Sequence, residues 1–137
     1  MSRWRDIDEQ RQLVQVLRET TAVDDRVFVW GFDPAINVWA QRRTVSRFLY
    51  NYPFRVSWGN PAYEAELLAA LRADPPEVFV VASKDRTTGV TGSRKDSAQL
   101  FAELEPLRAF VESHYARDRA VGRYTVYRLE PVTPPGG

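Results

Sequence analysis

The sequence predicts an α/β fold, specifically a three-layer α/β/α sandwich with a Rossmann-like mixed sheet. Two apolar runs rich in β-branched and aromatic residues, 27–30 and 77–82, have the composition of strands buried on both faces. A helical pattern lies between them, and a right-handed crossover would pair the two strands in parallel at the centre of the sheet. The alternating segment 115–129 predicts an antiparallel hairpin at its edge.

The first helix is predicted over 6–20, because Ile7 and Leu17 belong to an apolar stripe at helical spacing among polar residues. The strand 27–30 follows a turn. The segment 32–57 combines turn residues with many aromatic side chains, so it predicts irregular structure with short strands.

The run 36–40 is compatible with either a helical turn or a strand. Asn60 followed by Pro61 predicts the start of a helix, and the helix must end before Pro75. The segment 83–96 is polar and contains glycines, so we expect an exposed loop.

The last third of the chain predicts a helical segment and two strands. An apolar stripe over 100–111 indicates the helix, in which Pro106 either starts a second helix or bends the first. The strands 115–121 and 123–129 alternate in polarity and are joined tightly.

Length and composition predict one globular domain, 1–130, followed by a frayed tail of prolines and glycines, 131–137. Hydrophobic residues are 44% and charged residues 27% of the 137, which is the average globular mixture. The formal charge of +1 provides no one-signed field, so nucleic acid is not an expected partner. No run approaches the roughly 20 apolar residues of a membrane-spanning helix.

The usual catalytic side chains are scarce. The absence of cysteine excludes disulfides and thiolate metal sites, and the single histidine, His114, makes a catalytic triad or a histidine metal site a poor expectation. We therefore expect no metal, no cofactor and no catalytic residue in this chain.

Arginines and aromatic residues are concentrated over 39–58. Guanidinium groups and flat rings at that density could bind a phosphate or stack on a sugar or a base. The alternative, which the amphipathic character of arginine favours, is that the rings fill the core while the arginines extend to solvent.

The loop 83–96 is a second candidate site. It follows the carboxyl end of a predicted strand, where open α/β sheets place ligands, and it could bind an anion. It lacks the spacing of a Walker motif, and an ordinary loop is the favoured alternative. Its candidate anion-binding residues are Lys84, Gly89, Gly92, Ser93 and Arg94.

The stretches 26–36 and 43–50 resemble the soluble C-terminal domain of polytopic membrane glycosyltransferases. The type is that of the dolichyl-phosphate-mannose protein mannosyltransferases, with the C-type transferase fold. The resemblance extends to the strand after Pro76 and to the C-terminal hairpin. The positions that carry its motifs are Trp30, Gly31, Pro34, Trp39, Arg43, Ser46, Arg47 and Phe48.

The resemblance implies a parent enzyme that moves a sugar from a polyprenyl-phosphate donor, with this domain on its extracytoplasmic, periplasmic side. The expected partners are the membrane-spanning part of the parent chain and a glycan or a lipid-phosphate sugar. The chain lacks the membrane helices of that family and the acidic catalytic residues of its first extracytoplasmic loop, so the implied role is to bind or orient acceptor or donor. The candidate substrate-binding residues are Trp39, Arg43, Ser46, Arg47 and Tyr50.

Two alternatives stay open. The chain could be a free-standing cytoplasmic α/β module that binds a nucleotide or a small phosphate at the loop 83–96. It could also be a purely structural domain that packs against its membrane region and binds nothing.

Overall fold

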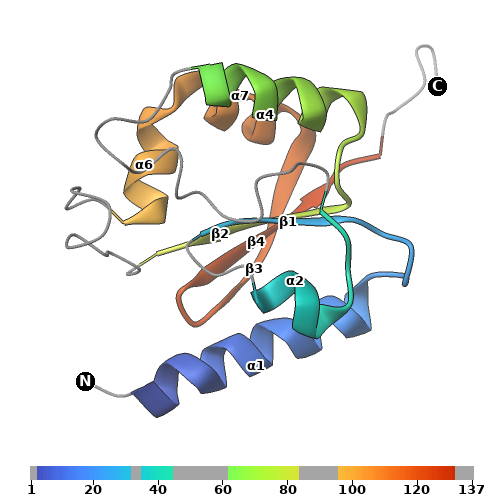
Figure 1. Cartoon of the computed structure of the whole chain (residues 1–137), viewed down its shortest axis with the longest axis vertical. Helices are drawn as coiled ribbons and strands as arrows, with labels where there is room; N and C mark the ends of the chain where they lie inside the picture. The colour runs from blue at the N-terminus through green and yellow to red at the C-terminus, as the bar shows by residue number, and fades with distance from the viewer. Residues whose placement is uncertain (1–2, 32–34, 45–61, 84–95, 132–137) are drawn as a thin grey trace.

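The computed structural model describes residues 3–31, 35–44, 62–83 and 96–131. In this part of the chain a four-stranded sheet lies between two helical layers (Figure 1). Helices α1 and α2 cover one face, and α4, α6 and α7 cover the other. The predicted α/β class is confirmed. In chain order the elements are α1 (Arg3–Thr20), β1 (Val27–Trp30), α2 (Ala35–Ala40), α4 (Ala62–Ala73), β2 (Val78–Ala82), α6 (Ser97–Glu103), α7 (Glu105–His114), β3 (Tyr115–Val121) and β4 (Tyr124–Leu129).

The sheet is mixed, and its order is β1-β2-β4-β3. Strands β1 and β2 pair in parallel, while β4 pairs antiparallel with both β2 and β3, so both predicted kinds of pairing are confirmed. Strand β2 has a strand on each side. Strand β1 lies at the end of this order, and beyond it the described residues show an isolated bridge between Arg26 and Arg43. With one parallel pair described, the Rossmann-like arrangement stays a prediction.

Side chains of β1 and β2 alternate between two separate cores. Val27 and Val29 face the aliphatic core under α1 and α2, whereas Phe28 and Trp30 face the aromatic core under α4, α6 and α7. Phe28 stacks on Phe79 of β2 at a ring-centroid distance of 5.2 Å. Every residue of both strands is buried, as their continuous apolar runs predicted.

A one-residue bulge divides β3. Arg117 pairs with Tyr127 and Arg119 pairs with Val126, so Asp118 is the extra residue. Because one inserted residue exchanges the two faces of a strand, the two ends of β3 face different cores. Tyr115 packs in the aromatic core, and Val121 packs in the aliphatic core.

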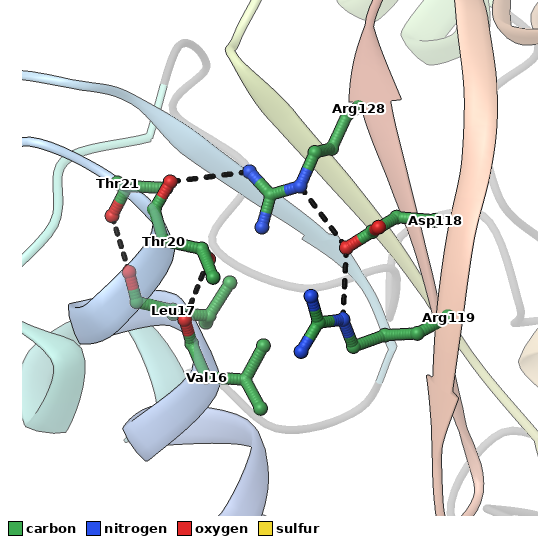
Figure 2. A network of polar contacts seen from close by, with 7 residues as sticks. All are labelled: Val16, Leu17, Thr20, Thr21, Asp118, Arg119 and Arg128. Carbon is green, nitrogen blue, oxygen red and sulfur yellow. Dashed lines mark hydrogen bonds and ion pairs between the residues drawn. The ribbon is translucent and has the colours of Figure 1, made fainter.

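The bulge residue organises a polar network that connects the hairpin to α1 (Figure 2). Asp118 accepts hydrogen bonds from the Nε atoms of Arg119, at 2.9 Å, and Arg128, at 3.0 Å. Arg128 also donates from Nη1 to the carbonyl of Thr20 at 3.2 Å, where α1 ends. A cation suits this helix terminus, so the network holds the C-terminal end of α1 on β4.

A second ion pair holds α1 near the opposite end of the hairpin. Arg123 donates from Nε to Glu9 at 2.9 Å, and both side chains are largely buried. The turn residue Gly122 has φ +57°, and an added Cβ would come within 2.5 Å of the Glu9 side chain. Glycine therefore suits both the left-handed turn and the close approach of the Glu9 side chain.

The structure resolves two alternatives that the sequence left open. Residues 35–40 form a helix, α2, and Pro106 lies in the first turn of a new helix, α7, after a break at Leu104. Asp96 caps α6 with a reciprocal pair of hydrogen bonds to Gln99. The expected start of α4 at Asn60, the short strands expected over 45–57 and the tail 132–137 lie outside the described residues.

Tyr115 connects the sheet to the loop before β2. Its hydroxyl donates to the carbonyl of buried Pro76 at 2.6 Å. Burial raises the pKa of the Tyr115 hydroxyl, and the negative charge of Glu77 raises this pKa further. The hydroxyl therefore stays protonated, and keeps donating, well beyond neutral pH.

We predict that Tyr115→Phe lowers the free energy of unfolding by about 1 to 2 kcal/mol, because the Pro76 carbonyl would remain buried without its donor. Urea denaturation of both chains measures the difference. Tyr127→Phe is the control, since Tyr127 is only partly buried on the same core. Equal stability of Tyr115→Phe and the wild type would contradict the prediction.

The Asp118 network predicts a pH-dependent stability. Partial burial raises the pKa of Asp118, but hydrogen bonds from Arg128 and Arg119 outweigh this, so the pKa lies below its usual value. The charged network thus stabilises the folded chain above about pH 4, and the contribution is lost as the pH falls through the folded pKa. Asp118→Asn should be less stable than the wild type at neutral pH, and the difference should vanish in acid.

Urea midpoints across an acid-to-neutral series measure this, with Asp24→Asn in the exposed turn after α1 as the control. A difference between wild type and Asp118→Asn that is the same at every pH would show that the carboxylate charge is not what stabilises the network.

Candidate functional site

The short helix α2 presents two large apolar side chains to solvent. Ile36 and Ala40 are buried against β1 and α1, whereas Val38 is 70% and Trp39 is 49% exposed. Exposed apolar side chains are common singly, but a half-exposed tryptophan beside an exposed valine is a feature of binding surfaces.

Asn37 fixes the position of α2. This buried side chain donates from Nδ2 to the carbonyl of Val27 at 2.8 Å and to that of Arg42 at 3.2 Å. The backbone N–H of Arg42 donates in return to the carbonyl of Asn37 at 3.1 Å, after Gln41 has turned the chain with φ +57°. The direction of Trp39 is therefore set by contacts with a core strand.

Arg42 anchors the same segment to the end of α1. Its guanidinium donates to the hydroxyl of Thr21 at 2.9 Å and to the carbonyl of Thr21 at 3.2 Å. Because these donors are engaged, Arg42 is a structural residue that holds α2 beside α1 rather than a group available to a ligand.

Trp39 lines a hollow of about 620 Å³ between α2 and the outer face of α1. Its remaining lining comes from α1, from residues that are three or four positions apart and so share one helix face. These residues are Ile7, Arg11, Val14, Gln15 and Arg18. We call this space the Trp39 hollow.

The two arginines of the Trp39 hollow are available for a ligand. Arg11 and Arg18 are exposed, and neither has an ion pair within the described ranges. Other arginines of the structure are paired with carboxylates: Arg26 with Asp74, Arg108 with Glu112, Arg119 and Arg128 with Asp118, and Arg123 with Glu9. The hollow thus combines an indole ring with two free guanidinium groups and no lining carboxylate.

A second, more open hollow of about 560 Å³ lies between α1 and the turn of the hairpin. It shares Arg11 and Gln15 with the Trp39 hollow, so the two lie on either side of one ridge on α1. Gln15 donates to Glu19 at 2.5 Å along this ridge. The other lining residues are Gln12, Val16, Ala120, Val121 and Gly122.

Of the predicted substrate-binding residues, the structure places Trp39 in the hollow. Arg43 is exposed but does not line it, and its backbone carbonyl accepts from Val27 at 2.9 Å beside the sheet. The other candidates, Ser46, Arg47 and Tyr50, lie outside the described residues, as do Lys84, Gly89, Gly92, Ser93 and Arg94 of the alternative loop and the motif residues Pro34 and Phe48.

Two motif positions belong to the core. Trp30 is fully buried and donates from Nε1 to the carbonyl of Ser97 at 2.9 Å, which attaches the end of β1 to α6. Gly31 is buried directly after it. Their place in the motif therefore has a structural reason and requires no ligand.

Arg11 and Arg18 were not predicted as site residues. The sequence did carry a signal, because Arg11, Val14 and Arg18 recur at helical spacing beside the stripe that packs on the sheet. What the sequence could not show is that α2 would place Trp39 next to this second stripe.

The described ranges contain no group of three or more side chains that could hold a metal ion. Within the same residues, no helix has the length and apolar character needed to cross a bilayer.

No protein-family model and no curated protein matches the chain. Among solved structures it is similar to the C-terminal globular domain of an oligosaccharyltransferase from Archaeoglobus fulgidus. The sequence identity is 13% and the TM-score 0.48, over 95% of this chain and 99% of that one. The assignment to the dolichyl-phosphate-mannose type and to the C-type fold stays a prediction.

Proposed function

We propose that this chain is a non-catalytic domain of a membrane glycosyltransferase that uses a polyprenyl-phosphate-linked sugar, and that it binds or orients the acceptor or the donor. The observation that supports the proposal best is the Trp39 hollow, in which a half-exposed indole lies beside Arg11 and Arg18. The family resemblance of the sequence supplies the class of parent enzyme and an extracytoplasmic position for the domain.

The chemistry of the Trp39 hollow suits a sugar that carries a phosphate. An indole offers a flat apolar face with a polar edge, on which the C–H face of a sugar ring can stack. Guanidinium groups bind phosphate with paired hydrogen bonds, and they do so best when no carboxylate of the protein already occupies them. Arg11 and Arg18 meet that condition.

The hollow is also held in place before any ligand arrives. Asn37 and Arg42 fix α2 through hydrogen bonds to β1 and α1, while Arg123 and Arg128 fix α1 on the hairpin. A rigid site loses little conformational entropy on binding, so even a small ligand with few contacts, such as a substrate headgroup, can bind to it.

We predict that the chain binds a hexose 1-phosphate more tightly than the free hexose. Trp39→Ala should weaken binding of both by roughly tenfold, since the stacking contact with the ring is lost. Arg11→Gln and Arg18→Gln should each weaken binding of the phosphate ester while leaving binding of the free hexose unchanged. Shifts of the backbone amide signals of α1 and α2 in NMR titrations measure these affinities in every variant, and Trp39→Phe identifies the Trp39 indole signal of the wild type.

Arg72→Gln is the matched control, because Arg72 is an exposed arginine in the last turn of α4, on the other helical layer. Binding of neither probe, or equal loss in Arg72→Gln and Arg18→Gln, would contradict a recognition role for the hollow and favour the purely structural alternative. In the parent enzyme, a folded Trp39→Ala variant should transfer sugar more slowly, and Arg43 and Arg47 are the next residues to replace.

A further inference from the structure

We infer that the face formed by α1 and α2 lies against the membrane, with Val38 and Trp39 in the headgroup region and Arg11 and Arg18 on anionic lipid headgroups. The inference rests on the proposed function, because only a domain attached to a membrane enzyme has a bilayer permanently beside it. The inference adds the orientation of the domain on the membrane, and it adds anionic lipid as a partner. The hollow alone defines neither of these.

The first argument is the kind of apolar surface that α2 exposes. Val38 and Trp39 are consecutive in a helix whose other side is buried, so both lie on its outward side. Tryptophan is the residue that collects at the boundary between water and hydrocarbon, because its ring is apolar and its N–H is polar. In this position it can enter a headgroup layer without burying a charge.

The second argument is the difference in charge between the two helical layers. Helices α4, α6 and α7 carry an excess of acidic side chains, five glutamates against two arginines. Helix α1 carries four arginines and four carboxylates and α2 carries no charged side chain, so this layer is neutral overall. Its Glu9 is also paired with Arg123 of the hairpin.

An anionic bilayer therefore repels the acidic layer of the sandwich but not the neutral layer formed by α1 and α2, on which Arg11 and Arg18 are exposed. Each basic group near such a surface contributes about a fivefold gain in partitioning, and Arg11 and Arg18 are both free to make it. The same orientation opens the Trp39 hollow toward the headgroup of a lipid-linked sugar. It thus favours the donor, rather than a distant acceptor, as the ligand of the hollow.

The test is partition of the chain onto vesicles of phosphatidylcholine with and without phosphatidylglycerol, followed by co-sedimentation. We expect binding to the anionic vesicles, a loss of roughly fivefold for each of Arg11→Gln and Arg18→Gln, and no loss for Arg72→Gln on the acidic layer. Val38→Ser should weaken partition, whereas Val23→Ser should not, although Val23 is equally exposed at 72%.

Quenching by brominated phosphatidylcholine then tests insertion of the ring directly, because the extra quenching in the wild type should be absent from Trp39→Phe. No preference for anionic vesicles, or equal losses in Arg72→Gln and Arg18→Gln, would overturn the inference. If the chain still binds hexose 1-phosphate in solution, only the orientation fails and the proposed function stands. If it binds neither vesicles nor the sugar phosphate, both fail.

Discussion

Burial of β1 and β2 on both faces is the constraint on which the rest of the structure depends. Two adjacent strands with no polar face must be covered by helices on both sides, and this alone requires three layers. Alternation along the strands then divides the core, with aromatic rings such as Phe28 and Phe79 on one side and valines on the other. Because α1 and α2 cover the valine side of the sheet, their outward-facing side chains form one outer surface of the domain.

The C-terminal hairpin determines how α1 lies on that surface. One extra residue in β3, Asp118, makes the side chains before and after it point to opposite cores. The same residue supplies a carboxylate for Arg128, which also donates a hydrogen bond to the end of α1. Nearer the start of α1, Arg123 donates a hydrogen bond to Glu9, whose side chain lies close against Gly122. Helix α1 is therefore attached by polar contacts at two points along its length. Between these points Leu13 and Leu17 pack in the core, while Arg11 and Gln15 form the ridge between the two hollows.

The sequence predicted the strands, the C-terminal ends of α1 and α4 and both kinds of strand pairing, because these depend on local periodicity and on turn residues such as Gly122. It did not show that β1 lies at the end of the described sheet, since apolar runs report burial and helices can supply that burial as well as strands can. The density of rings and arginines around Trp39, together with the family resemblance, made it a candidate binding residue. Arg11 and Arg18 were not found, because they join it only through tertiary packing. The bulge at Asp118 has no local signal either, since Arg117 to Ala120 are all exposed.

The partial exposure of Trp39 is informative, because α2 also has a buried side on which this ring could have been placed. Helix α2 is fixed by Asn37 in a buried position, and the same helix buries Ile36 and Ala40 completely. A purely structural helix of this length would gain most by burying its largest side chain, since a buried ring contributes more to stability than an alanine does. Here the ring instead faces two arginines that no carboxylate of the described chain neutralises. A guanidinium group can rest against an indole ring, but the ring leaves the positive charge without a counterion. A ligand that combines an apolar face with an anionic group satisfies the ring and the charges together, and the phosphate-linked sugar proposed above has that character.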